Sequence, residues 1–199
     1  MTQFVIATHN RGKIAELQRL LKWTGNSGRA YTDLAPRQQF PPESTVSYRE
    51  NATNKALTVS RALPSEYVLA DDSGLQLAAV PDWLGVTTAR DLADCPTPEA
   101  YDERILAKLR GRRREFTMVS WLVCAHNNRI IARVQAELHG QVATNQRGQY
   151  SRGFDRILIP QGSSQTLAEL PFEERRSYLV RGQAVRAMIK KLGECRNEN

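Results

Sequence analysis

The sequence predicts an α/β protein with a large mixed sheet. An apolar run at residues 4–7 is followed by an amphipathic helix pattern whose apolar positions lie between Ile14 and Leu21. The middle of the chain is rich in strand patterns instead, at residues 115–126 and 129–143, with Asn127-Asn128 as the turn between them. Early alternation of strand and helix, together with this β-rich middle, favours a mixed sheet over a purely parallel one.

The remaining elements follow from the same patterns. We expect helices at residues 47–63, 97–109 and 182–192, a helix entry at 166–170, and short strands at residues 67–70, 75–80 and 154–160. Thr97-Pro98 marks the start of its helix, with Thr as the N-cap residue and Pro in the first turn. The polar segment Asp71-Asp72-Ser73-Gly74 is expected to interrupt the strand pattern.

Length and charge limit the classes of partner. The 199 residues suffice for one domain or two closely packed lobes. A net charge of +7 favours an anionic partner, either a nucleic acid or a polyphosphate nucleotide. The most basic run, Arg110 to Arg114, has no interleaved aromatic residue that could stack on bases, so a solvated loop is the better interpretation.

The same composition favours a cytoplasmic protein. No apolar run approaches the roughly 20 residues that span a bilayer, and the chain begins with a strand pattern rather than a secretory signal. Cys95, Cys124 and Cys195 are scattered and form no C-x-x-C pair, which indicates neither zinc nor a disulfide framework. We therefore expect a reducing compartment and no membrane association.

The first candidate site is the turn from Thr8 to Lys13, which connects the first strand to the first helix. The free N–H groups and the dipole of a helix N-terminus favour an anion, and Lys13 adds a cation. The segment is neither a Walker loop nor a dinucleotide fingerprint. Two interpretations stay open: a phosphate cradle, or an ordinary turn in which Asn10 caps the helix.

The second candidate site is the adjacent pair Asp71-Asp72, directly after a buried strand. Burial of two adjacent carboxylates is unfavourable without a compensating cation. Neighbouring side chains of a strand point to opposite faces, so at most one of the two enters a shared cleft. Carboxylate oxygens suit Mg²⁺ and can also activate water. The alternative is a turn in which these side chains bond the local backbone before Gly74.

Further polar candidates lie near these two segments. Glu43, in a Pro-rich loop, either reaches a metal or lies on the surface. Asn51 and Lys55 share one helical face, where they bind a phosphate or face solvent. The three histidines have no adjacent nucleophile pattern, so no covalent mechanism is predicted.

Taken in order, several segments resemble the motifs of the inosine triphosphatase family, the house-cleaning nucleoside-triphosphate pyrophosphatases. Residues 7–13 are similar to its A-T-x-N-x-G-K opening, and residues 70–75 match A-D-D-S-G-L at every position. The other matching segments are Glu43 with Glu50-Asn51-Ala52 and Lys55-Ala56, Gly85 to Arg90, Thr166 to Leu170, and Arg181 to Ala184. Each motif is weak alone, but their order across nearly the whole chain is specific.

The resemblance implies a single domain over residues 1–199 with two lobes, a long curved mixed sheet flanked by helices, and a nucleotide cleft between the lobes. It also implies a homodimer that hydrolyses a nucleoside triphosphate to a monophosphate and pyrophosphate with Mg²⁺. Thr8, Asn10, Lys13 and Lys55 would bind phosphates, Glu43 and Asp72 the metal, and Asp72 would activate water. The substrate-binding residues implied are Ser73, Arg90, Arg152, Gly153, Phe154, Asp155, Arg175 and Arg181.

The chain departs from the family pattern where the base is read. Arg152 stands in place of the Phe that stacks on the base, and Val180 in place of a base-contacting His. Arg175 stands in place of a Lys. Because base discrimination depends on such polar groups, we expect a pyrophosphatase with altered base specificity. The alternative is a catalytically weak nucleotide-binding or regulatory homologue, and a nucleic-acid-binding protein ranks below both.

Overall fold

The structure is a computed structural model that describes residues 1–197, with side chains up to residue 194. The chain divides into two compact units. Unit 1 comprises residues 1–72, 120–136 and 181–197, and unit 2 comprises residues 73–119 and 137–180. Three strands contribute residues to both units, so neither unit is one continuous stretch of chain.

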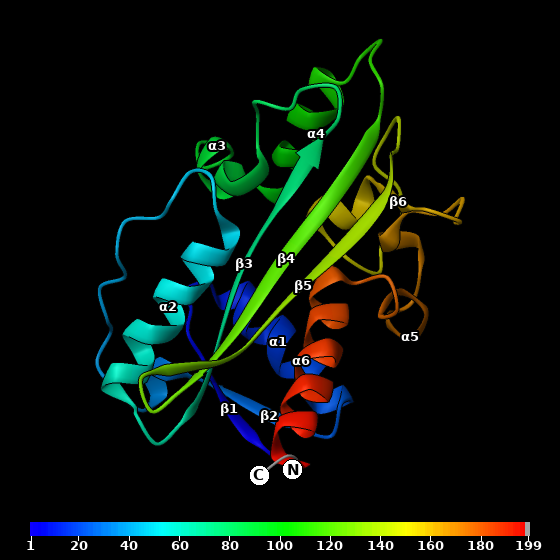
Figure 1. The fold of residues 1–199 in the computed structure, drawn as a ribbon. Coiled ribbons are helices and arrows are strands. Elements are labelled where there is room, and N and C mark those ends of the chain that lie inside the picture. Colours follow the sequence, from blue (N-terminus) through cyan, green and yellow to red (C-terminus); the bar gives the residue numbers. More distant parts are fainter. Residues whose placement is uncertain (198–199) are drawn as a thin grey trace. The chain divides into compact units, whose positions relative to one another are not determined.

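The strands form a six-stranded mixed sheet in the order β2-β1-β3-β4-β5-β6 (Figure 1). Their bounds are β1 Gln3–Ile6, β2 Ser27–Ala30, β3 Tyr67–Leu77, β4 Glu115–His126, β5 Arg129–Val142 and β6 Leu158–Pro160. β1 pairs in parallel with β2 and β3, whereas β5 and β6 are antiparallel. Helices flank this open sheet, so the α/β class with a mixed sheet that the sequence predicted is confirmed.

The helices agree with most of the predicted positions. They are α1 Arg11–Trp23, α2 Tyr48–Ala62, α3 Thr88–Asp91, α4 Pro98–Lys108, α5 Phe172–Arg175 and α6 Val180–Asn197. Four short 3-10 helices accompany them: η1 Tyr31–Asp33, η2 Gly85–Thr87, η3 Gly153–Arg156 and η4 Leu167–Glu169. Within the described part of the chain, no helix combines the length and the apolar character that a membrane span requires.

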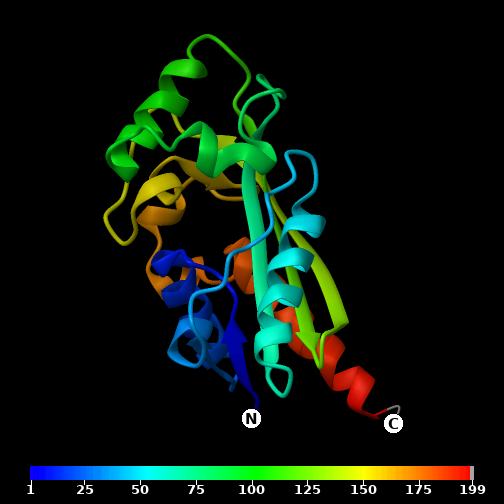
Figure 2. The ribbon, with the colours of Figure 1, turned by 90° about the vertical axis from the view of Figure 1, so that its left-hand side faces the viewer.

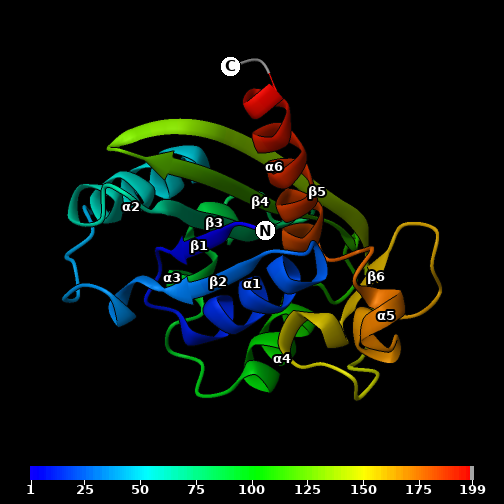
Figure 3. The same cartoon turned by 90° about the horizontal axis from the view of Figure 1, so that it is seen from below.

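The core of unit 1 lies between α2 and the strands β1, β3 and β4. Ala52, Ala56 and Val59 present the buried face of α2 to a cluster that includes Val5 and Val68. Figures 1 and 2 both show α2 lying along β3. In Figure 3, α1 lies beside β2, in agreement with the contacts between these two elements. Packing of α1 and α2 against the sheet therefore fixes where their N-terminal residues lie within unit 1.

Local signals in the sequence place the helix starts correctly. The hydroxyls of Ser47 and Thr97 accept from backbone N–H groups three residues later, at 3.1 and 3.2 Å, and thereby cap α2 and α4. Asn127 and Asn128 both adopt positive φ, as a two-residue hairpin turn requires, and join β4 to β5. Cys95 and Cys124 are free and buried, and the Cys195 side chain lies outside the described residues.

The predicted interruption at residues 71–74 was wrong, because β3 continues through it to Leu77. The carboxylates there bond side chains of other elements: Asp71 bonds Ser120 of β4, and Asp72 bonds Lys55 of α2. Glycine at position 74 lets β3 pass close to the backbone of Gly85. An added Cβ would lie 2.0 Å from the carbonyl oxygen of Gly85. The strand expected at residues 154–160 was too long, because η3 occupies its first half. The sequence analysis also missed β2.

Gly74→Ala should destabilise the protein because its methyl group meets backbone atoms that cannot rotate away. We expect a loss of about 1–3 kcal/mol in the free energy of unfolding, measured by urea denaturation. Gly193→Ala is the matched control, since its added Cβ meets no atom within 4 Å and alanine favours a helix by roughly 1 kcal/mol. Equal stability of Gly74→Ala and the wild type would contradict this account of β3.

Candidate functional site

Two adjacent carboxylates of β3 point to opposite faces of the sheet and bind different partners. Asp71 bonds Ser120 of β4 at 2.7 Å and contacts Lys13 of α1 at 2.9 Å and Arg181 of α6 at 3.0 Å. Asp72 instead contacts side chains of α2. The opposite orientation expected for neighbouring strand residues is therefore confirmed.

Asp71 is the centre of a buried ion cluster. Asp71 is only 1% exposed. One of its partners, Arg181, also contacts Glu16 of α1 at 2.7 Å. Burial by itself would raise the pKa of Asp71, but Lys13 and Arg181 outweigh it and hold that pKa well below its ordinary value. Burial likewise opposes the charge of Arg181, yet Glu16 and Asp71 raise its pKa. The cluster connects α1, β3, β4 and α6.

Asp72 belongs to a second cluster, which has an excess of negative charge. The ammonium of Lys55 lies 2.8 Å from Asp72 Oδ1 and 2.5 Å from Glu43 Oε1. Burial would lower the pKa of Lys55, but Asp72 and Glu43 outweigh this effect and raise it, so Lys55 is protonated. Two carboxylates and one ammonium leave a net charge of −1 in this group.

Asn51 fixes the orientation of Asp72. Its side-chain amide donates to Asp72 Oδ2 at 3.1 Å and to the carbonyl of Ser44 at 3.1 Å, and its own oxygen accepts from the Ser44 N–H at 2.7 Å. The i, i+4 spacing places Asn51 and Lys55 on one face of α2, as expected, and both bond Asp72. Asn51 is buried and does not face solvent.

The carboxylates around Lys55 suit a magnesium ion. Glu43 and Asp72 both lie within bonding distance of one cationic group, so their oxygens already converge on a shared cation position. Magnesium is commonly held by one or two carboxylates, with water and substrate phosphates as the other ligands. In the residues that the structure describes, no group of three or more His, Cys, Asp or Glu side chains could hold a metal by itself. The donor set therefore fits Mg²⁺ with a phosphate substrate.

The first turn is a capped helix start in this structure. The side chain of Asn10 accepts from the Lys13 N–H at 3.0 Å, and Thr8 Oγ1 accepts from the Asn10 N–H at 3.2 Å. The capping role that the sequence left open for Asn10 is therefore confirmed. Phosphate binding by Thr8, Asn10 and Lys13 stays a prediction. His9 serves packing, since its ring stacks on Phe40 and contacts Tyr31.

The residues expected to read the base belong to unit 2, apart from Arg181. Asp155 of η3 lies 3.6 Å from the buried guanidinium of Arg175, which also donates to the Leu170 carbonyl at 3.1 Å. Phe154 contacts Tyr101 of α4 through its ring, while Arg152 is exposed at the start of η3. Of the other residues assigned to substrate, Arg90 is exposed, and Ser73 and Gly153 are partly buried. Substrate binding by all these residues stays a prediction.

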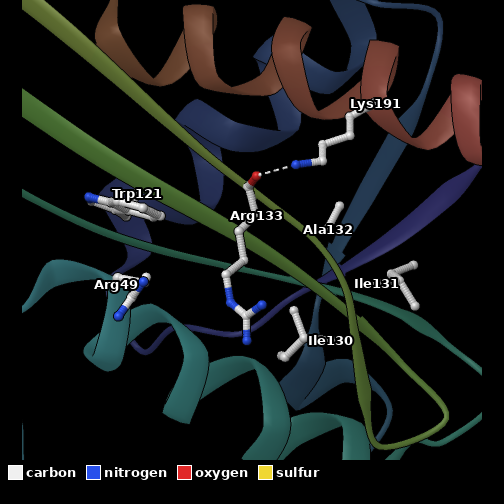
Figure 4. A pocket seen from close by; sticks show the side chains of 7 residues that line it. All are labelled: Arg49, Trp121, Ile130, Ile131, Ala132, Arg133 and Lys191. Atoms are coloured by element: carbon white, nitrogen blue, oxygen red, sulfur yellow. Dashed lines mark hydrogen bonds between the residues drawn. The ribbon is translucent and has the colours of Figure 1, made fainter.

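A separate pocket in unit 1 has a different character. Figure 4 shows its lining, which comes from α2, β4, β5 and α6 and surrounds about 380 Å³. The lining residues are Arg49, Trp121, Ile130, Ile131, Ala132, Arg133 and Lys191. It contains three cations and no carboxylate, and none of the predicted site residues takes part. This pocket is therefore not the candidate metal site.

The sequence analysis missed two partners of the site and misread a third. The two missed partners are Ser120, which donates a hydrogen bond to Asp71, and Glu16, which accepts one from Arg181. The third is Asn51, which donates a hydrogen bond to Asp72. A lone serine within the apolar run of β4 was the available signal for Ser120. Glu16 gave no signal, because a glutamate on an amphipathic helix is ordinarily solvated.

Comparison with known proteins assigns the family. The model of the Ham1 family matches residues 4–191, so the chain belongs to this family, which confirms the resemblance to the inosine triphosphatases. A dihydroneopterin triphosphate diphosphatase of Limosilactobacillus reuteri is 44% identical, and the alignment covers 96% of this chain and 98% of that protein. A dITP/XTP pyrophosphatase of Deinococcus deserti is 33% identical over 94% of this chain and 87% of that protein. The solved structure of a HAM1 protein from Coxiella burnetii has a TM-score of 0.80 at 27% identity, covering 98% of this chain and all of that one.

Asp71→Asn should strongly destabilise the fold, because it leaves Lys13 and Arg181 without their shared buried anion. We expect a loss of about 3–5 kcal/mol in the free energy of unfolding, measured by urea denaturation at neutral pH. The exposed Asp33→Asn is the control and should cost less than about 0.5 kcal/mol.

The same pair of proteins should show a specific pH dependence. The folded pKa of Asp71 lies below its unfolded value of 3.8, so its stabilisation is complete above that value and is lost as the pH falls further. The stability difference between wild type and Asp71→Asn should shrink below about pH 4. A difference that is small at neutral pH, or that does not change in acid, would show that this ion cluster does not stabilise the fold.

Proposed function

We propose that this chain is a Mg²⁺-dependent nucleoside-triphosphate pyrophosphatase that releases a monophosphate and pyrophosphate. The observation that carries the proposal is the convergence of Glu43 and Asp72 on one cation position, in a chain of the Ham1 family. Relatives named dITP/XTP pyrophosphatase and dihydroneopterin triphosphate diphosphatase support the reaction class.

Each residue of unit 1 has a proposed role. Glu43 and Asp72 hold the metal, whose positive charge would stabilise the charge that develops on the phosphates. Asp72 Oδ1 or Oδ2 orients the attacking water and accepts its proton, while Asn51 keeps the carboxylate in place. Lys55 holds the two carboxylates together in this structure, and its ammonium would also neutralise the charge of a bound phosphate. Thr8, Asn10 and Lys13 supply the remaining phosphate contacts, at the N-terminus of α1.

The base is proposed to be a pterin rather than a purine. A relative 44% identical over nearly its full length is named for dihydroneopterin triphosphate, and this chain has Arg152 and Val180 where the family pattern has Phe and His. A guanidinium can stack on a flat heterocycle and donate hydrogen bonds, which suits a base richer in polar groups. Asp155 and Arg175 would complete the base contacts.

A second candidate is a deaminated purine nucleotide such as dITP or XTP. It is favoured by relatives at 33% identity named for these substrates, and by the retention of Asp155 and Arg181 from the family motif. We also propose the homodimer that the family resemblance implies and the cytoplasmic location that the composition favours. The net charge of +7 fits a polyphosphate substrate, and nucleic acid is not proposed as a partner.

Asp72→Asn should abolish most of the activity, because an amide is a poor metal ligand and cannot accept the proton of water. We expect a fall of at least about 100-fold in kcat/KM, measured as pyrophosphate released from dihydroneopterin triphosphate, dITP, XTP, GTP and ATP with Mg²⁺. Omission of Mg²⁺ should abolish turnover by the wild type. Asp33→Asn is the control and should retain full activity. Tight nucleotide binding without turnover by the wild type would favour the non-catalytic alternative instead.

Restoring the family residues should move the base preference toward purines. In the double variant Arg152→Phe/Val180→His, we expect the ratio of kcat/KM for dITP over that for dihydroneopterin triphosphate to rise at least about tenfold. Arg152→Phe alone should raise this ratio by a smaller factor. Because Arg152 is exposed, the substitution should not affect the fold. An unchanged ratio in both variants would mean that these two positions do not set the base preference.

A further inference from the structure

Unit 2 contains a buried carboxyl group that the proposed mechanism does not use. Asp102 lies on α4 and is 0% exposed. Neither of its carboxyl oxygens has a hydrogen-bond partner among the described residues. Such groups are rare because a buried charged carboxylate without partners is strongly unfavourable. A carboxyl group in this position is therefore expected to have a specific role.

The charges that act on Asp102 come from α4 itself and from η3, which packs against α4. Glu99 and Glu103 of α4 and Asp155 of η3 oppose its ionisation, whereas Arg156 of η3 favours it. Burial has the largest effect, and together these influences raise the pKa of Asp102 to about 7. The carboxyl group therefore changes its charge close to neutral pH.

The segment packed on α4 is the one assigned to the base. η3 spans Gly153–Arg156, and its Phe154 contacts Tyr101, the neighbour of Asp102, with ring centroids 6.5 Å apart. Ionised Asp102 attracts Arg156 and repels Asp155, which stand next to each other in η3. Ionisation of Asp102 therefore exerts forces of opposite sign on the adjacent residues Asp155 and Arg156 of η3.

We propose that Asp102 is a positioning residue: η3 keeps the conformation that contacts the base while the Asp102 carboxyl group is neutral, and ionisation of that group weakens binding of the base. This inference rests on the proposed function, because it takes η3 as the base-contacting segment. Asp102 acts through Arg156 and Asp155 and does not touch the substrate. The triphosphate contacts, which belong to unit 1, are unaffected by it.

The pH profile of KM tests the proposal. If substrate binds only the form with neutral Asp102, KM for the best substrate should rise about tenfold between pH 6 and one pH unit above the pKa of Asp102. Asp102→Asn stays neutral and should show a flat profile, with little change in kcat. Comparing the two proteins at each pH cancels the ionisation of the substrate itself. Asp102→Leu, also without a charge, serves if the Asn variant folds poorly.

Two controls separate positioning from a general effect on the fold. Glu103→Gln removes a charge from the exposed face of the same helix and keeps Asp102, so the rise in KM should persist. Because Glu103 opposes the ionisation of Asp102, that rise should move to lower pH. Inorganic tripolyphosphate, which has no base, should inhibit the wild type and Asp102→Asn with the same pH profile. The proposal is overturned if KM of the wild type and of Asp102→Asn changes equally with pH, or if tripolyphosphate inhibition shows the same difference between them.

The proposed function can fail separately from this inference. If the wild type turns over no triphosphate, the pyrophosphatase proposal is wrong. The affinity for dihydroneopterin triphosphate and dITP, measured directly by calorimetry, then replaces KM in the same comparison of wild type and Asp102→Asn. Equal pH dependence of affinity in the two proteins would overturn the role of Asp102 in that case as well.

Discussion

The burial of two adjacent carboxylates in the middle of β3 is the constraint on which the site depends. A buried carboxylate is tolerated only with a cation and hydrogen bonds close to it. Asp71 obtains them from Lys13, Arg181 and Ser120, and Asp72 from Lys55 and Asn51. Helices α1, α2 and α6 are thereby connected to one strand by charge as well as by apolar packing.

The two clusters differ in the ratio of cations to carboxylates. Around Asp71, the two cations Lys13 and Arg181 face the two carboxylates of Asp71 and Glu16. Around Asp72, one ammonium faces two carboxylates, and an additional cation would bring further stabilisation. Adjacent residues of the same type thus have different partners because alternate faces of a strand meet different helices.

Unit 2 carries the features that distinguish this chain from the family pattern. Arg152 and Val180 depart from the motif, while Asp102 lies buried beneath η3, the segment that follows Arg152. The motifs of unit 1 that the family resemblance assigns to phosphate and metal are retained, as a triphosphate substrate with any base would require. Divergence at the positions that the family resemblance assigns to the base is what a change of base would require.

The sequence by itself determined the fold class, most helices, the family and the importance of Asp71-Asp72, because periodicity, capping residues and ordered motifs are local signals. It also predicted that the two carboxylates diverge. Only the tertiary structure decided that β3 runs unbroken through them, which partners each one has, and that Asn51 is buried against Asp72. Only the tertiary structure shows that Asp102 is buried. Its environment depends on η3, which lies some fifty residues away in the sequence. Burial and ion pairing between distant segments leave no local pattern, and this is the physical reason for the difference.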